Sequence, residues 1–180
     1  MDKITEPAKL KAATTYNAAA DHFDDGPLAF WDRYGRETIE RLRLKPGSIV
    51  LDVGCGSGAS AIPAAKAVGP HGRVIGADLA ERLLVMAQAK ADAQKLINAT
   101  FRQADMENLG YSDDSFDAVV CVFAIFFVPD MVKQVHELWR MVRAGAPTRD
   151  HDLGTPHVRA RLCRLVGCRK TISPRSPCRL

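Results

Sequence analysis

The chain has 180 residues, of which 47% are hydrophobic and 26% charged, a composition typical of one soluble globular domain. Its longest apolar run, residues 118–128, is too short for a membrane helix, and the N-terminus lacks the apolar core of a secretion signal. Five scattered cysteines do not indicate a disulfide framework, so we expect a cytoplasmic protein that does not bind a membrane.

The net charge of +4 is distributed unevenly along the chain. Residues 145–180 contain eight Arg and Lys against Asp150 and Asp152, a net of +6, so residues 1–144 carry −2. This segment shows neither helical nor strand periodicity, and we expect a basic, irregular tail over residues 144–180. A metal site and nucleic-acid binding are not expected there, because Cys-x-x-Cys spacing and interleaved aromatics are both missing from the tail's sequence.

The predicted elements alternate along the chain. Residues 8–44 are expected to be helical with a break at 24–27, and the later elements are a strand at 48–53, a helix at 59–68, a strand at 73–77, a helix at 79–96, strands at 100–104 and 116–123, and a helix at 130–142. Strands that alternate with helices predict an α/β fold with a doubly wound parallel sheet, covered on both faces, after an N-terminal helical segment.

The segment Val50–Gly58, VLDVGCGSG, carries the clearest functional signal. An apolar strand is followed by three alternating glycines, which allow a tight turn and close approach of the backbone to a ligand. The segment therefore predicts a nucleotide-type cofactor loop. Gly54, Gly56 and Ala59 also satisfy the dinucleotide pattern, so the glycines alone leave a nicotinamide cofactor open.

Three acids mark the ends of predicted strands. Asp52, Asp78 and Asp105 should converge on one crevice, because ligands of open parallel sheets bind outside the carboxyl ends of the strands. Asp78 follows Gly58 by 20 residues, the spacing of an acid that binds ribose hydroxyls. A dinucleotide site needs neither Asp52 nor Asp105, and these two acids therefore favour a different nucleotide cofactor.

Several motifs together resemble one enzyme family. VLDVGCGSG, VIGADLA and ADMENLGYSDDSFDAVVCVFAIFFVPD are similar to the motifs of class I S-adenosylmethionine-dependent methyltransferases of the ubiquinone-biosynthesis-like (methyltransferase type 11) group, over residues 14–143. The resemblance implies a Rossmann-like fold, S-adenosyl-L-methionine as cofactor and a small-molecule methyl acceptor. It also implies an N-terminal helical lid segment (1–44) before the cofactor-binding domain (45–143).

The resemblance implies where the cofactor would lie. The glycine loop would border its methionine part, the acid after the second strand would bind the ribose, and the chain after the third strand would flank the adenine. A residue after the fourth strand would lie near the sulfonium, and an aromatic of the N-terminal helix would cover the cofactor. In chain order the residues are Tyr16, Asp52, Gly54, Cys55, Gly56, Gly58, Asp78, Leu79, Asp105, Met106 and Cys121.

No catalytic base is evident in the sequence. His136 is expected on a solvated helix face, and His22 beside Phe23 is a weak candidate. Phe123, Phe126 and Phe127 are candidates for an acceptor pocket, although we expect at least two of the three to pack in the core.

The resemblance stops after Met141-Val142-Arg143, where the family continues with further strands and this chain does not. Residues 153–170 can be translated back into all the codons that could encode them. When these codons are read one base later, they permit Trp-Gly-Pro and then Phe-Glu-Pro-Ala-Tyr, which is similar to the way the family's sequences continue. We therefore hypothesise a frameshift near residues 143–145, which would leave the sheet incomplete after its fourth strand. As an alternative to an active enzyme, the chain would then be a cofactor-binding remnant without catalysis. An early stop in the shifted frame of the coding DNA would refute the frameshift.

Overall fold

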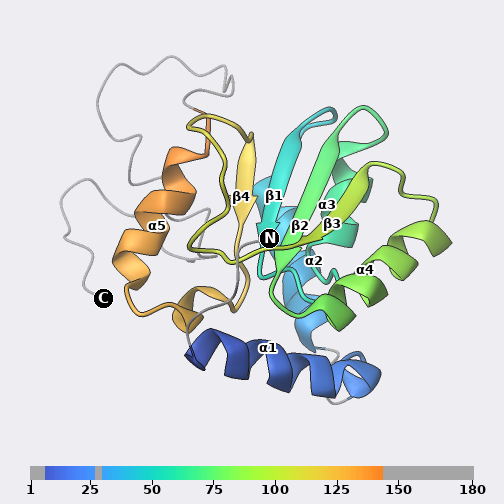
Figure 1. The fold of residues 1–180 in the computed structure, drawn as a ribbon. Helices are drawn as coiled ribbons and strands as arrows, with labels where there is room; N and C mark the ends of the chain where they lie inside the picture. Colours follow the sequence, from blue (N-terminus) through green and yellow to red (C-terminus); the bar gives the residue numbers. More distant parts are fainter. Residues whose placement is uncertain (1–6, 27–29, 144–180) are drawn as a thin grey trace.

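The structure, a computed structural model, describes residues 7–26 and 30–143. Within them, strands β1 (Ile49–Val53), β2 (Arg73–Asp78), β3 (Ala99–Gln103) and β4 (Ala118–Val120) form one sheet of order β3-β2-β1-β4 (Figure 1). Every pairing in this sheet is parallel. The predicted α/β fold is confirmed for these residues, while the expectations for the 144–180 tail lie outside the described part of the chain.

Helices and loops cover both faces of the sheet. Val50, Val74 and Val120 pack on one side with α2 (Phe30–Leu42), α3 (Ala61–Val68) and the end of α4 (Glu81–Ala93). The alternate residues Leu51 and Val53 pack on the other side with α5 (Met131–Arg140). This alternation explains why the strands are apolar almost throughout, since both faces are buried.

The fourth strand is much shorter than the predicted 116–123, and this expectation was wrong. Asp117 interrupts the apolar ladder, because its Oδ2 accepts a hydrogen bond of 2.7 Å from the backbone N–H of Ile49. Beyond β4 the backbone turns at Phe123, which has a φ of 57°, into the short 3-10 helix η3 (Ile125–Phe127). The apolar run therefore leaves the sheet and continues as a loop at its carboxyl end.

The N-terminal residues form α1 (Pro7–Ala19), η1 (Ala20–His22) and α2, as the interrupted helical pattern predicted. Figure 1 shows α1 lying across the end of the molecule beneath the sheet and α4. Arg82 at the start of α4 holds the far end of α1. Its backbone N–H donates to Asn17 Oδ1 (2.9 Å), and its guanidinium donates to the Asn17 carbonyl (2.8 Å).

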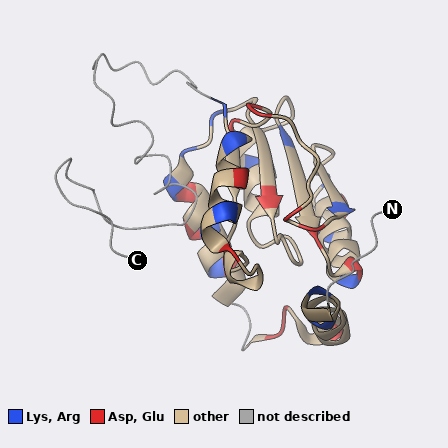
Figure 2. Cartoon of the chain, turned by 60° about the vertical axis from the view of Figure 1, so that its left-hand side comes forward, with Lys and Arg blue, Asp and Glu red and all other residues tan. Residues whose placement is uncertain are grey.

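Charge is concentrated on the helices and loops. Figure 2 shows basic and acidic positions interspersed on the helices, and a sheet that is mostly uncharged. Among the described helices, none combines the length and apolar character that crossing a bilayer requires.

Candidate functional site

A pocket lies between α1 and the carboxyl ends of the strands. It contains about 1070 Å³ of space, a volume that includes its open mouth. Its wall is formed by α1, the β1–α3 loop and the chain at the ends of β2, β3 and β4, together with Phe23 after η1 and Trp31 of α2. The principal lining residues are Lys9, Tyr16, Phe23, Trp31, Gly54, Cys55, Gly56, Ser57, Ser60, Asp78, Leu79, Asp105, Met106, Phe123, Phe127 and Val128.

The β1–α3 loop needs glycine where it meets the chain after β4. Gly54 has a φ of 69°, and its backbone N–H donates to the Ala77 carbonyl at 2.8 Å. A Cβ at this position would overlap the Cβ of Ala124. Glycine is therefore required both by the left-handed turn and by the close approach of the second loop.

Asp78 organises the centre of the site. Its Oδ2 accepts from the backbone N–H of Gly56 (2.9 Å), and its Oδ1 accepts from the backbone N–H of Ala80 (2.9 Å). Burial raises the pKa of the Asp78 carboxyl, while these backbone hydrogen bonds oppose the increase. Because a carboxylate offers about four acceptor positions, Asp78 can shape the loop and still accept hydrogen bonds from a ligand.

Asp52 lies behind the pocket wall instead of in it. It is 1% exposed, and its Oδ2 accepts a hydrogen bond of 2.6 Å from the Oγ of Ser60, which itself lines the pocket. Among the described residues, the buried Oδ1 has no hydrogen-bond partner. Burial raises the pKa of Asp52 to about 7, because a charged carboxylate loses its hydration there.

This elevated pKa predicts that Asp52 makes stability depend on pH. The native carboxyl keeps its proton up to about pH 7, whereas the unfolded one releases it near its ordinary pKa, about 3.9. The contribution of Asp52 to the free energy of unfolding should therefore be fully present below pH 4 and be lost as pH rises to 7, a change on the order of 4 kcal/mol. Urea unfolding of the protein and of Asp52→Asn, which can still accept from Ser60, tests this. The same pH profile in both proteins would contradict it.

Lys9 of α1 reaches the chain that follows β3. Its Nζ lies 2.8 Å from Asp105 Oδ2 and also forms an ion pair with Glu107. Burial by itself would lower the pKa of Lys9, but the hydrogen bonds to the two acids raise it above its usual value. Together with the Arg82 contacts, this pair holds α1 over the pocket from both ends.

Aromatic side chains form the other wall of the pocket. The ring of Tyr16 meets those of Phe23 (centroids 6.0 Å apart) and Phe127 (5.8 Å) edge to face. Trp31 meets Phe123 in the same way at 5.3 Å. Burial and the nearby charge of Asp78 raise the pKa of Tyr16.

The expectation that at least two of the three phenylalanines after β4 pack in the core was wrong. Phe123, Phe126 and Phe127 are 43%, 55% and 42% exposed. The turn at Phe123 directs this segment away from the sheet, and Phe123 and Phe127 line the pocket instead.

The structure brings most of the predicted site residues to this one pocket. Tyr16, Gly54, Cys55, Gly56, Asp78, Leu79, Asp105 and Met106 all line it. Three do not belong to its wall: Asp52 lies behind Ser60, Gly58 packs beside Ile62 and Ala87, and Cys121 lies against the core cluster of β1 and α5. Contact with a cofactor stays a prediction for all eleven residues.

Sequence reasoning missed Lys9 and Trp31 as lining residues. The concentration of aromatics between residues 16 and 34 was a usable signal for Trp31, whereas nothing in the pattern of α1 distinguishes Lys9. His136 is exposed, as expected. His22 is exposed too, pairs with Asp25 at 2.9 Å and is not among the lining residues.

Comparison with known proteins shows which family and which structures this chain is similar to. The family model for a methyltransferase domain matches residues 50–145. The demethylmenaquinone methyltransferase of Alkalihalophilus pseudofirmus is 32% identical over 110 residues, 61% of this chain and 47% of that protein. The chain thus spans about half the length of the curated relatives that it matches.

Two solved structures are similar to this chain in fold. An S-adenosylmethionine-dependent methyltransferase from Aquifex aeolicus superposes with a TM-score of 0.59 at 24% identity, over 78% of each chain, which supports the fold. An arsenic(III) S-adenosylmethionine methyltransferase from Chlamydomonas reinhardtii is 36% identical, with a TM-score of 0.51 over 56% of this chain and 36% of the other.

Proposed function

This chain belongs to the family of S-adenosylmethionine-dependent methyltransferases, and we propose that it transfers a methyl group from S-adenosyl-L-methionine to a small-molecule acceptor. The observation that carries the proposal is the convergence of the glycine loop, Asp78 and Asp105 on one pocket. The proposal includes the division of the chain into a lid segment (1–44) and a cofactor-binding domain (45–143). The position of α1 over the pocket supports this division.

The lining residues fit the parts of this cofactor. Asp78 has acceptor positions to spare for ribose hydroxyls, and Leu79 and Met106 supply apolar surface for an adenine ring. The loop from Gly54 to Gly56 presents backbone to the remaining, methionine part. Tyr16 lies on the covering helix, where it would shield the reacting end from water.

The chain contributes mainly by position and by excluding water. When bound, the cofactor supplies an activated methyl group on a positively charged sulfonium. Alignment of an acceptor with such a group is worth up to about 7–11 kcal/mol in ideal cases. The described lining residues include no histidine, and Lys9 is engaged with two acids. The proposal therefore assigns no general base.

The acceptor is proposed only as a class. The relatives described above are named for demethylmenaquinone and for arsenic(III), two chemically different acceptors. The wall of Trp31, Phe123 and Phe127 supports an acceptor with an apolar part, since exposed aromatic surface in a pocket favours such ligands.

A second candidate is a cofactor-binding unit without catalysis. The observation in its favour is that the described lining residues include no histidine and that Lys9 is engaged with two acids, so no general base is evident among them. Such a unit would bind the cofactor and transfer no methyl group.

Calorimetric titration and a transfer assay separate these functions. We expect saturable binding of S-adenosylhomocysteine, no binding of NAD⁺, and transfer of label from methyl-labelled S-adenosylmethionine to one member of a panel of quinols, thiols and arsenite. Gly54→Val should abolish binding and serve as the negative control, because its side chain would overlap Ala124. Binding of NAD⁺ alone would refute the proposal, and binding without transfer to any acceptor would favour the second candidate.

A further inference from the structure

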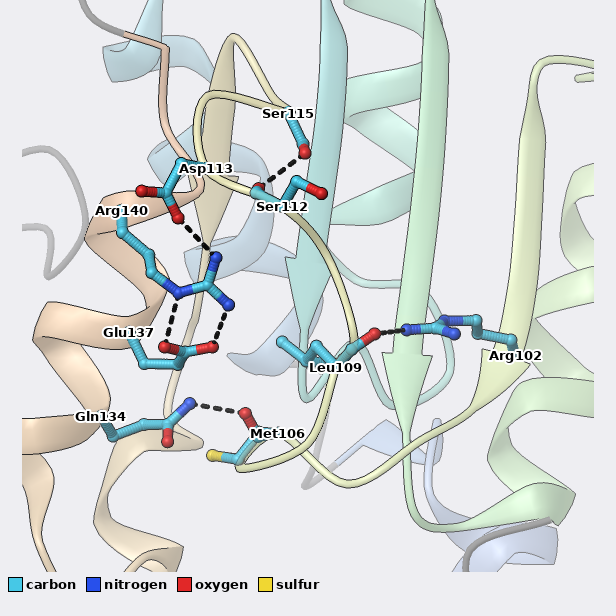
Figure 3. A network of polar contacts seen from close by, with 9 residues as sticks. All are labelled: Arg102, Met106, Leu109, Ser112, Asp113, Ser115, Gln134, Glu137 and Arg140. Atoms are coloured by element: carbon cyan, nitrogen blue, oxygen red, sulfur yellow. Dashed lines mark hydrogen bonds and ion pairs between the residues drawn. The ribbon is translucent and has the colours of Figure 1, made fainter.

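The segment between β3 and β4 depends on side chains of other elements for its position. Residues 104–115 contain neither helix nor strand, yet Asp105 and Met106 of this segment line the pocket. Figure 3 shows three outside contacts with it: Arg102 donates to the Leu109 carbonyl (2.5 Å), Gln134 to the Met106 carbonyl (2.6 Å) and Arg140 to Asp113 (2.8 Å).

The Gln134 contact differs from the two arginine contacts in how deeply its side chain is buried and in which residue of the segment accepts the hydrogen bond. Arg102 and Asp113 are exposed, whereas Gln134 is 4% exposed. Of the three contacts, this one alone meets a residue of the pocket wall. This hydrogen bond is partly buried, so the Met106 carbonyl that remains when its donor is removed is less easily hydrated than a carbonyl at the surface.

The turn that Gln134 contacts, residues 105–108, has hydrogen bonds of its own. Asp105 Oδ1 accepts from the backbone N–H of Glu107 (2.9 Å), and the Asp105 carbonyl accepts from the N–H of Asn108 (2.9 Å). These bonds shape residues 105–108 locally but do not place them relative to the sheet. The contact between Gln134 and Met106 contributes to that placement from α5, while Lys9 pairs with Asp105 and Glu107 from α1.

The helix that carries Gln134 begins beside the opposite wall of the pocket. Val128 lines the pocket, and α5 starts three residues later, capped by Asp130 Oδ1, which accepts from the N–H of Lys133 (2.9 Å). Gln134 lies one turn further on, and its N–H donates to the Asp130 carbonyl (3.0 Å). One short helix therefore connects the loop after β4 with the turn after β3.

We propose that Gln134 is a positioning residue that, through Met106, holds the turn of Asp105 and Met106 against the adenine ring of the cofactor. The Asp105 carboxylate in the pocket wall can accept from the exocyclic amino group of adenine, which hypoxanthine lacks, so displacement of the turn should weaken binding of adenine more than that of hypoxanthine. The inference rests on the proposed function. Gln134 is not among the lining residues and would act through Met106.

The test compares Gln134→Met, which keeps the side-chain volume without the donor, with Arg140→Met, which removes a surface contact to the same segment. Calorimetry gives the affinities for S-adenosylhomocysteine and for its inosine analogue, in which hypoxanthine replaces adenine. We expect Gln134→Met to weaken S-adenosylhomocysteine binding roughly tenfold, a loss of about 1.4 kcal/mol, and the inosine analogue by less than about threefold. Arg140→Met should leave both affinities within about twofold.

Two results would overturn the inference: unchanged binding of S-adenosylhomocysteine by Gln134→Met, or equal losses for the two nucleosides. Gln134→Leu repeats the test if the Met variant does not fold. Amide hydrogen exchange without ligand supplies a separate readout, because residues 105–108 should exchange faster in the Gln134 variants than in Arg140→Met. If the unaltered protein bound no S-adenosylhomocysteine, the proposed function would fail, and the exchange rates would still decide whether Gln134 holds the turn.

Discussion

Replacing Gly35 by alanine is expected to destabilise the fold and weaken cofactor binding together, although alanine is the better helix former. A Cβ at Gly35 on α2 would lie 2.5 Å from the carbonyl carbon of Ala59 and 2.9 Å from the backbone nitrogen of Ser60. These are backbone atoms of the loop that enters α3, so they cannot rotate away as a side chain can. We expect a net loss of about 2–3 kcal/mol, despite a helix-propensity gain of about 1 kcal/mol.

Urea unfolding and titration with S-adenosylhomocysteine measure the two effects of Gly35→Ala. Gly26→Ala is the matched control, because a Cβ there meets no atom within 4 Å. Its stability should change by no more than about 0.5 kcal/mol. A Gly35→Ala protein more stable than the unaltered one would show that α2 does not press against the glycine loop.

Replacing Asp78 by alanine is expected to weaken binding of S-adenosylhomocysteine by about 1–3 kcal/mol, roughly fivefold to 150-fold. The substitution removes the acceptor proposed for the ribose hydroxyls. It also leaves the backbone N–H groups of Gly56 and Ala80 without their acceptor, so the glycine loop loses its tie to the end of β2. The free energy of unfolding should therefore fall as well.

Asp78→Asn separates the two roles, because its amide retains one oxygen that can accept from the backbone. It should recover part of the stability and little of the affinity. Asp113→Ala controls for the loss of a carboxylate, since Asp113 is exposed and pairs with Arg140 at the surface. Unchanged affinity in Asp78→Ala would remove Asp78 from the site.

The local pattern was enough to predict the architecture and the centre of the site. The buried face of α4, formed by Leu83, Leu84, Ala87 and Ala91, follows the helical spacing that predicts a helix over residues 79–96. The acids after β2 and β3 were placed at the pocket because parallel strands present their carboxyl ends at one edge of a sheet. Such features depend on neighbouring residues and on the periodicity of the strands and helices.

The sequence by itself determined the alternating fold, the glycine loop and the pocket acids Asp78 and Asp105. Only the tertiary structure decided which partners meet them. Lys9 lies 96 residues from Asp105, and Gln134 lies 28 residues from Met106. The structure also placed Gly35 against Ala59 and turned Phe123 out of the sheet. These contacts arise from how whole elements pack against one another, and no spacing within a single element encodes them.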